Sequence, residues 1–96
     1  MRVCALVSDL MDRSKITSAI PGVVFALDGN ADVVIVDIGR SAQMVPEIRA
    51  EMPGTRIVCF GPHVDDAAAD AARAAGADVV IPRSRFFRDP TAAIAP

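Results

Sequence analysis

The chain has 96 residues, of which 52% are hydrophobic and 23% charged, with a formal net charge of −2. This composition excludes an intrinsically disordered chain and predicts a single domain over residues 1–96. The slight acidity argues against nucleic-acid binding, and the apolar run at residues 3–7 is too short for a signal peptide or a membrane span. We therefore expect a cytoplasmic protein in which Cys4 and Cys59 are buried free thiols.

Short apolar runs alternate with helical patterns along the chain. The apolar runs are bounded by turn signals, which is typical of buried strands, and they cover residues 3–7, 23–27, 33–38, 57–60 and 79–81. Helices are predicted for residues 10–20, 42–52 and 65–75, and the tail of residues 84–96 has room for a short helix ending at Asp89-Pro90. Strands alternating with helices predict an α/β domain with a doubly wound, parallel five-stranded sheet.

One connection in this scheme is too short. Only residues 28–32 separate the second apolar run from the third, and such a segment spans at most about 18 Å when extended. A parallel crossover usually takes a dozen or more residues. The helix between these two strands is therefore expected to be missing or vestigial, or else the second strand is antiparallel, irregular or exchanged with a partner chain.

Polar residues and glycines stand where four of the predicted strands end. In an open parallel sheet the carboxyl ends of the strands face one crevice. Two carboxylates and one guanidinium are thus predicted to converge at one edge of the sheet. The residues at these ends are Ser8, Asp9, Asp37, Gly61 and Arg83.

Each acid also has a purely structural role open to it. Asp9 can cap the helix that follows it, because its side-chain oxygens accept free backbone N–H groups. Asp37 can pair with Arg83 or cap the turn after its strand. Asp12 is expected on the helix surface, and His63 is expected to have no chemical role.

The segment RSRFFR, residues 83–88, mixes arginines with phenylalanines, and such residues are enriched in interface cores. It is a candidate docking patch. We expect one phenylalanine to pack inward and the other to stay partly outside. The interface candidates are Arg85, Phe86, Phe87 and Arg88.

Four segments resemble the receiver (CheY-like) domains of two-component response regulators: LVSDLMDRSKI, VIVDIG, IVCFGPH and AARAAGADVVIPRS. The resemblance runs over about residues 2–84. It implies a flavodoxin-like sheet with the strand order 2-1-3-4-5, a phosphate-accepting aspartate at Asp37, and Mg²⁺ held by Asp9 and Asp37. It also implies phosphate contacts from Arg83, Gly61 and Ser8.

The chain departs from the family pattern at three of these positions. Ser8 stands where an acid is expected, Gly61 stands in place of a hydroxyl residue, and Arg83 replaces a lysine. We therefore predict a non-enzymatic regulatory module that binds a protein, a sensor kinase or itself, with little or no phosphotransfer. Homodimerisation is implied by the resemblance alone. The alternatives are a working Mg²⁺-dependent phospho-acceptor at Asp37, or a binder of a small phosphate-bearing ligand in the same crevice.

Overall fold

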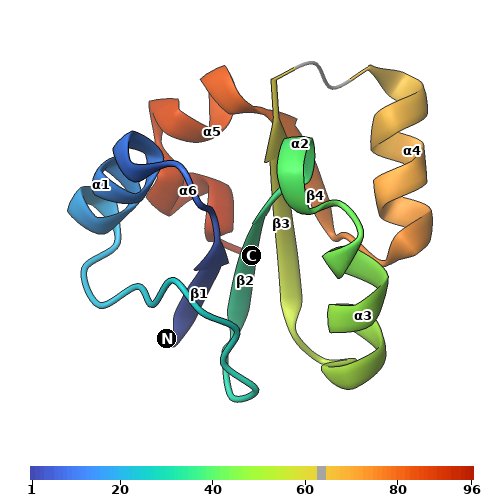
Figure 1. Ribbon diagram of the computed structural model, residues 1–96, viewed down its shortest axis with the longest axis horizontal. Helices are drawn as coiled ribbons and strands as arrows, with labels where there is room; N and C mark the ends of the chain where they lie inside the picture. Colours follow the sequence, from blue (N-terminus) through green and yellow to red (C-terminus); the bar gives the residue numbers. More distant parts are fainter. Residues whose placement is uncertain (63–64) are drawn as a thin grey trace.

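The computed structural model describes residues 1–62 and 65–96, so the expectation for His63 lies outside the described residues. The described chain contains one sheet of four parallel strands in the order β1-β2-β3-β4 (Figure 1). The strands are β1 (Val3–Leu6), β2 (Val33–Asp37), β3 (Arg56–Gly61) and β4 (Val79–Pro82). They correspond to the first, third, fourth and fifth predicted strands.

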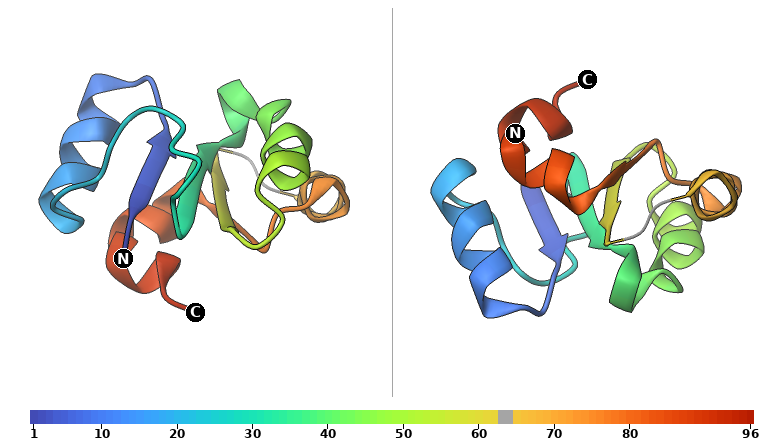
Figure 2. Two further views of the ribbon diagram at one scale, coloured as in Figure 1. Left: turned by 90° about the horizontal axis from the view of Figure 1, so that it is seen from below. Right: turned by 90° about the horizontal axis from the view of Figure 1, so that it is seen from above.

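Helices cover both faces of the sheet, as a doubly wound domain requires (Figure 2). Helices α1 (Leu10–Ala19), α5 (Arg83–Arg88) and α6 (Pro90–Ile94) lie on one face. Helices α3 (Met44–Glu51) and α4 (Asp66–Ala75) lie on the other, next to the short α2 (Ile38–Ser41). No helix in the described part of the chain is long and apolar enough to cross a membrane.

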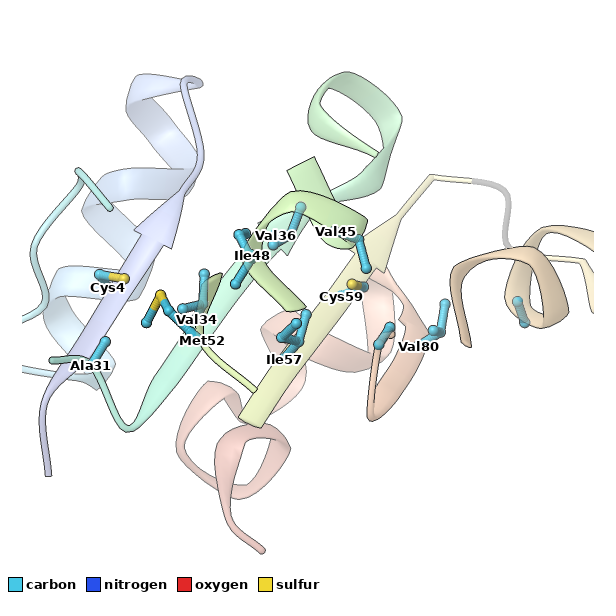
Figure 3. Packing of buried hydrophobic residues seen from close by; sticks show 12 residues of the cluster. Cys4, Ala31, Val34, Val36, Val45, Ile48, Met52, Ile57, Cys59 and Val80 are labelled. Atoms are coloured by element: carbon cyan, nitrogen blue, oxygen red, sulfur yellow. The ribbon is translucent and has the colours of Figure 1, made fainter. Parts of the chain in front are cut away.

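The unbroken apolar run of β2 follows from this two-sided burial. Val34 and Val36 pack with Ile48 of α3 in one core cluster (Figure 3). Val33 and Ile35 point to the opposite face and join the second cluster, with α1 and α6. Because successive side chains of a strand point to opposite faces, a strand covered on both faces carries apolar residues at every position.

The predicted second strand at residues 23–27 is wrong, since this segment forms only an isolated parallel bridge between Val24 and Cys4. The backbone of Val24 donates to the carbonyl of Val3 over 3.1 Å and accepts from the N–H of Ala5 over 2.9 Å. The connection of residues 28–32 is too short for a parallel crossover to β2. This explains why residues 23–27 do not form a full strand beside β1. Residues 21–32, all described, contain no helix, which confirms the missing crossover helix.

Two helical predictions also change at their ends. The helix predicted for residues 42–52 is preceded by the separate turn of α2, which begins directly after β2. The tail contains two helices, because Asp89 caps α6 by accepting from the N–H of Ala92 over 3.1 Å, and Pro90 opens that helix. The Asp89-Pro90 pair therefore starts a helix as well as ending one.

Candidate functional site

Asp37 ends β2 with its side chain turned into the protein, and the residue is 5% exposed. Its Oδ1 accepts a hydrogen bond of 2.9 Å from the backbone N–H of Gly39, so Asp37 is the N-cap of α2. A Cβ atom on Gly39 would lie 3.1 Å from Asp37 Oδ1 and 3.2 Å from Pro62 Cδ. The turn thus encloses one face of the carboxylate, and only a residue without a side chain fits there comfortably.

Asp9 is the N-cap of α1, and its Oδ1 accepts from the backbone N–H of Asp12 over 2.9 Å. This hydrogen bond is the main reason that the pKa of Asp9 is lowered, although desolvation by burial acts against it. The N–H of Met11 and the positive charges of Arg40 and Arg83 lower the pKa further. Asp9 therefore has the structural role that the sequence left open to it, and it lies within electrostatic reach of Arg83.

Asp12 is buried and binds the arginine of the site, contrary to the expectation that it lies on the helix surface. Arg83 donates from NH2 to Asp12 Oδ1 over 2.6 Å, and the two side chains are 37% and 3% exposed. A signal for this was present in the sequence: Asp12, Ile16 and Ile20 are spaced by four residues and so share one face of the helix. Leu10 and Met11, two further apolar residues of this helix, are 77% and 71% exposed.

The guanidinium of Arg83 is held by carboxylates and aromatic rings together. The hydrogen bond that Arg83 donates to Asp12 is the largest contribution to the raised pKa of Arg83, and the charges of Asp37 and Asp9 add to it while burial opposes it. Its carbon Cζ also lies 5.7 Å from the ring centroid of Phe60 and 5.1 Å from that of Phe87, within the range of cation–π attraction. The carboxylate of Asp12 and the two aromatic rings together hold the Arg83 guanidinium on the sheet face that α1 covers.

The docking patch divides between core and surface as expected for its phenylalanines. Phe86 is fully buried and stacks on Phe60 with ring centroids 4.7 Å apart, so it contributes to the core and offers no exposed contact. Phe87 is half-buried, and Arg85 and Arg88 are exposed. The surface of the patch is therefore made of Arg85, Phe87 and Arg88.

The remaining site candidates lie at the same edge of the sheet. Gly61 is buried at the end of β3 and stands opposite Pro82 in the register with β4. Ser8 is exposed between β1 and α1. Across residues 1–62 and 65–96, Arg83 forms its ion pair with Asp12 and forms none with Asp37.

The acidic side chains expected to hold Mg²⁺ are few in the described residues. No group of three or more His, Cys, Asp or Glu side chains is placed there to hold a metal ion. Asp9 and Asp37 each use one oxygen to accept a backbone hydrogen bond, and Arg83 holds the nearby Asp12. Mg²⁺ takes six oxygen ligands, several of which are usually waters, and one or two carboxylates commonly hold it, so Asp9 and Asp37 are the residues that would bind it here.

No protein-family model matches the chain, and no curated protein matches it. Solved structures of response regulators do match, each over 99% of this chain. A response regulator from Thermotoga maritima has a TM-score of 0.73 at 18% identity, with 98% of its chain covered. HP1043, an orphan response regulator of H. pylori, has a TM-score of 0.74 at 17% identity, with 97% covered.

A response regulator protein from Burkholderia pseudomallei, solved with a phosphorylated aspartic acid, a calcium ion and citrate, has a TM-score of 0.77 at 14% identity, with 67% of its chain covered. These likenesses lie in the fold, and they extend over both sheet faces and nearly all of the chain. The chain therefore has the parallel α/β fold of response-regulator receiver domains.

Proposed function

We propose that this chain is a receiver-type regulatory module of two-component signalling that acts by protein–protein interaction, with little or no phosphotransfer at Asp37. The receiver-type fold supports the first part. The observation that carries the second part is the 2.6 Å ion pair between Arg83 and Asp12, because it engages the basic residue near Asp37 with another carboxylate.

Phosphoryl transfer depends on positive charge placed around the phosphoryl oxygens. If Arg83 moved to a phosphate on Asp37, it would leave the carboxylate of Asp12 buried without its counter-ion. Removing one partner of a fully buried ion pair costs about 3–5 kcal/mol, and the partial exposure of Arg83 reduces this figure here. A phosphorylated Asp37 would thus have to overcome a competing carboxylate.

The position of Asp37 supports the same proposal. Its carboxylate is buried and caps α2, and Gly39 and Pro62 crowd the cap. Gly61 offers no hydroxyl group to a phosphate. A phosphoryl group on Asp37 would convert its carboxylate to an acyl phosphate and so add negative charge near the carboxylate of Asp9.

The second candidate function is a working phospho-acceptor that uses Mg²⁺ at Asp9 and Asp37. One observation favours it: the charges of Asp37 and Asp9 both raise the pKa of Arg83, so the three groups lie near enough to interact. The neighbour from Burkholderia pseudomallei, with its phosphorylated aspartic acid and calcium ion, is an example of such a state in that protein.

Intact mass after incubation with Mg²⁺ and acetyl phosphate separates the two functions. We expect no phosphoryl-sized mass gain in the wild type, while a known working receiver treated in the same way serves as the positive control. A gain in the wild type that is absent in Asp37→Asn would establish the second function. The variant Asp12→Asn is the sharper comparison, because it releases Arg83: a gain only in that variant identifies the ion pair as the block.

The untreated protein should be weighed under native conditions as well. A co-purified phosphate-bearing ligand that is lost in Arg83→Gln would favour the remaining hypothesis, that the chain binds a small phosphate-bearing ligand at the carboxyl ends of the strands.

The partner in this proposal is a protein in the cytoplasm, either a sensor kinase or a second copy of this chain. The exposed Arg85 and Arg88, with the half-buried Phe87, are the contact candidates. Sedimentation at increasing concentration tests self-association. Dimerisation that Arg85→Glu abolishes would make the second copy the partner, and a monomer at all concentrations would leave a kinase-type protein.

A further inference from the structure

A second concave site lies away from Asp37, between the outer strand β4 and the C-terminal helices. The hollow has a volume of about 360 Å³, which is in the size range of pockets for small molecules. Side chains from β3, β4 and α5 and the residue after α5 surround it. They include Arg56, Val79, Ile81, Arg85, Arg88 and Asp89.

The lining of this hollow carries an excess of positive charge. It contains three arginines and one carboxylate, and Asp89 already uses its Oδ1 to accept from the backbone N–H of Ala92. In the described part of the chain, none of the three arginines takes part in an ion pair. Positive side chains gathered in a concave site attract anions, because the low-dielectric walls focus their field.

Arg56 is more buried than Arg85 and Arg88, the other two arginines of the hollow. Its NH2 donates to the carbonyl of Ala95 over 3.0 Å, but its Nε is buried and has no hydrogen-bond partner among the described residues. It is the one buried side-chain nitrogen or oxygen of which this holds in that part of the chain.

We infer that this hollow binds a small organic anion, namely a phosphate or carboxylate group joined to a compact apolar part. Guanidinium groups present N–H donors in a planar fork that matches the oxygens of both anions. The apolar part would rest on Val79 and Ile81 of β4. The inference does not depend on phosphorylation at Asp37, and it places a ligand on the same surface as the proposed protein contact of Arg85 and Arg88.

Phenyl phosphate is a suitable probe, with inorganic phosphate as the anion alone and benzyl alcohol as the uncharged control, all at equal ionic strength. We expect saturable binding of phenyl phosphate by calorimetry, and amide resonance changes in β4, α5 and α6 of the intact chain. Arg56→Gln and Arg88→Gln should each weaken binding about tenfold, because a charge-assisted hydrogen bond is lost. Arg73→Gln, which removes an exposed arginine of α4, should leave the affinity unchanged.

The inference is overturned if phenyl phosphate does not saturate, if Arg73→Gln weakens binding as much as Arg88→Gln, or if the resonance changes centre on Asp37. Equal binding of benzyl alcohol would also overturn it, because the arginines would then play no part. Urea unfolding checks that Arg56→Gln still folds. If it does not, Arg85→Gln and Arg88→Gln decide the question, since both side chains are exposed.

Discussion

The guanidinium of Arg83 and the carboxylate of Asp12 are 2.6 Å apart although 71 positions separate them in the chain. The pair connects the first turn of α1 to the start of α5, directly after β4, at the edge of the sheet where the strands end. It joins an early and a late segment of the chain.

This ion pair should be measurable as a coupling between the two residues. Because Asp12 is buried and Arg83 is partly exposed, we expect Arg83→Gln to lower the free energy of unfolding by about 2 kcal/mol, less than for a fully buried pair. Asp12→Asn should cost about as much. In urea unfolding, the double variant should lose about 1 kcal/mol less than the sum of the single losses. Strictly additive losses would contradict the pairing.

Asp37 should matter to stability as a helix cap more than as a charge. Asparagine caps helices about as well as aspartate, so Asp37→Asn should change the free energy of unfolding by less than about 0.5 kcal/mol, while Asp37→Ala should cost about 1 kcal/mol or more. Urea unfolding measures both, with the exposed Asp70→Asn as the control. A large loss in Asp37→Asn would indicate that the negative charge itself holds the crevice together.

The sequence pattern predicts four of the strands well because each is a buried apolar run between turn signals. The same signal misleads at residues 23–27, where Val24 is 50% exposed despite its apolar neighbours. An apolar run becomes a strand only where it can pair with another strand. Here the short connection of residues 28–32 limits the pairing of residues 23–27. The length of this connection therefore predicted the missing strand better than the apolar composition of residues 23–27 did.

The site shows a similar division. Asp9 and Asp37 could be placed at one edge because strand ends of a parallel sheet share an edge. The burial of Asp12 was not predicted because aspartate is seldom buried unless it is paired, although its spacing to Ile16 places it on the buried face of α1. Whether Arg83 pairs with Asp12 or with Asp37 depends on how α1 packs against α5. The local sequence does not specify that packing.

Gly76 should tolerate no side chain. Its φ is +124°, and an added Cβ would lie 2.7 Å from Cβ and Cγ of Arg49, whose guanidinium binds the carbonyl of Gly76. Strain of this kind costs about 1–3 kcal/mol, so Gly76→Ala should lower the free energy of unfolding by about 2 kcal/mol. Gly54→Ala is the matched control, because its Cβ would meet nothing within 4 Å. Equal effects of the two substitutions would rule out this account.

The buried thiols should make the protein less stable in alkali. Burial raises the pKa of Cys59 to about 12 and also raises that of Cys4, whereas both thiols have the ordinary value of 9.0 in the unfolded chain. Above about pH 9 the unfolded state therefore loses protons that the folded state keeps, and the free energy of unfolding falls as pH rises. The loss is largest for Cys59, with a limit of about 1.4 kcal/mol per pH unit up to its folded pKa.

Urea unfolding under reducing conditions, between about pH 8 and about pH 11, tests this dependence. The chain suits the test because it contains no tyrosine, so few other groups titrate in this range. Cys59→Ala should be less stable at neutral pH but lose less stability with each further pH unit. Val58→Ala, which trims a neighbouring core residue of β3, should be destabilised at every pH and keep the slope of the wild type. If both variants keep that slope, the thiol of Cys59 is not the group that titrates.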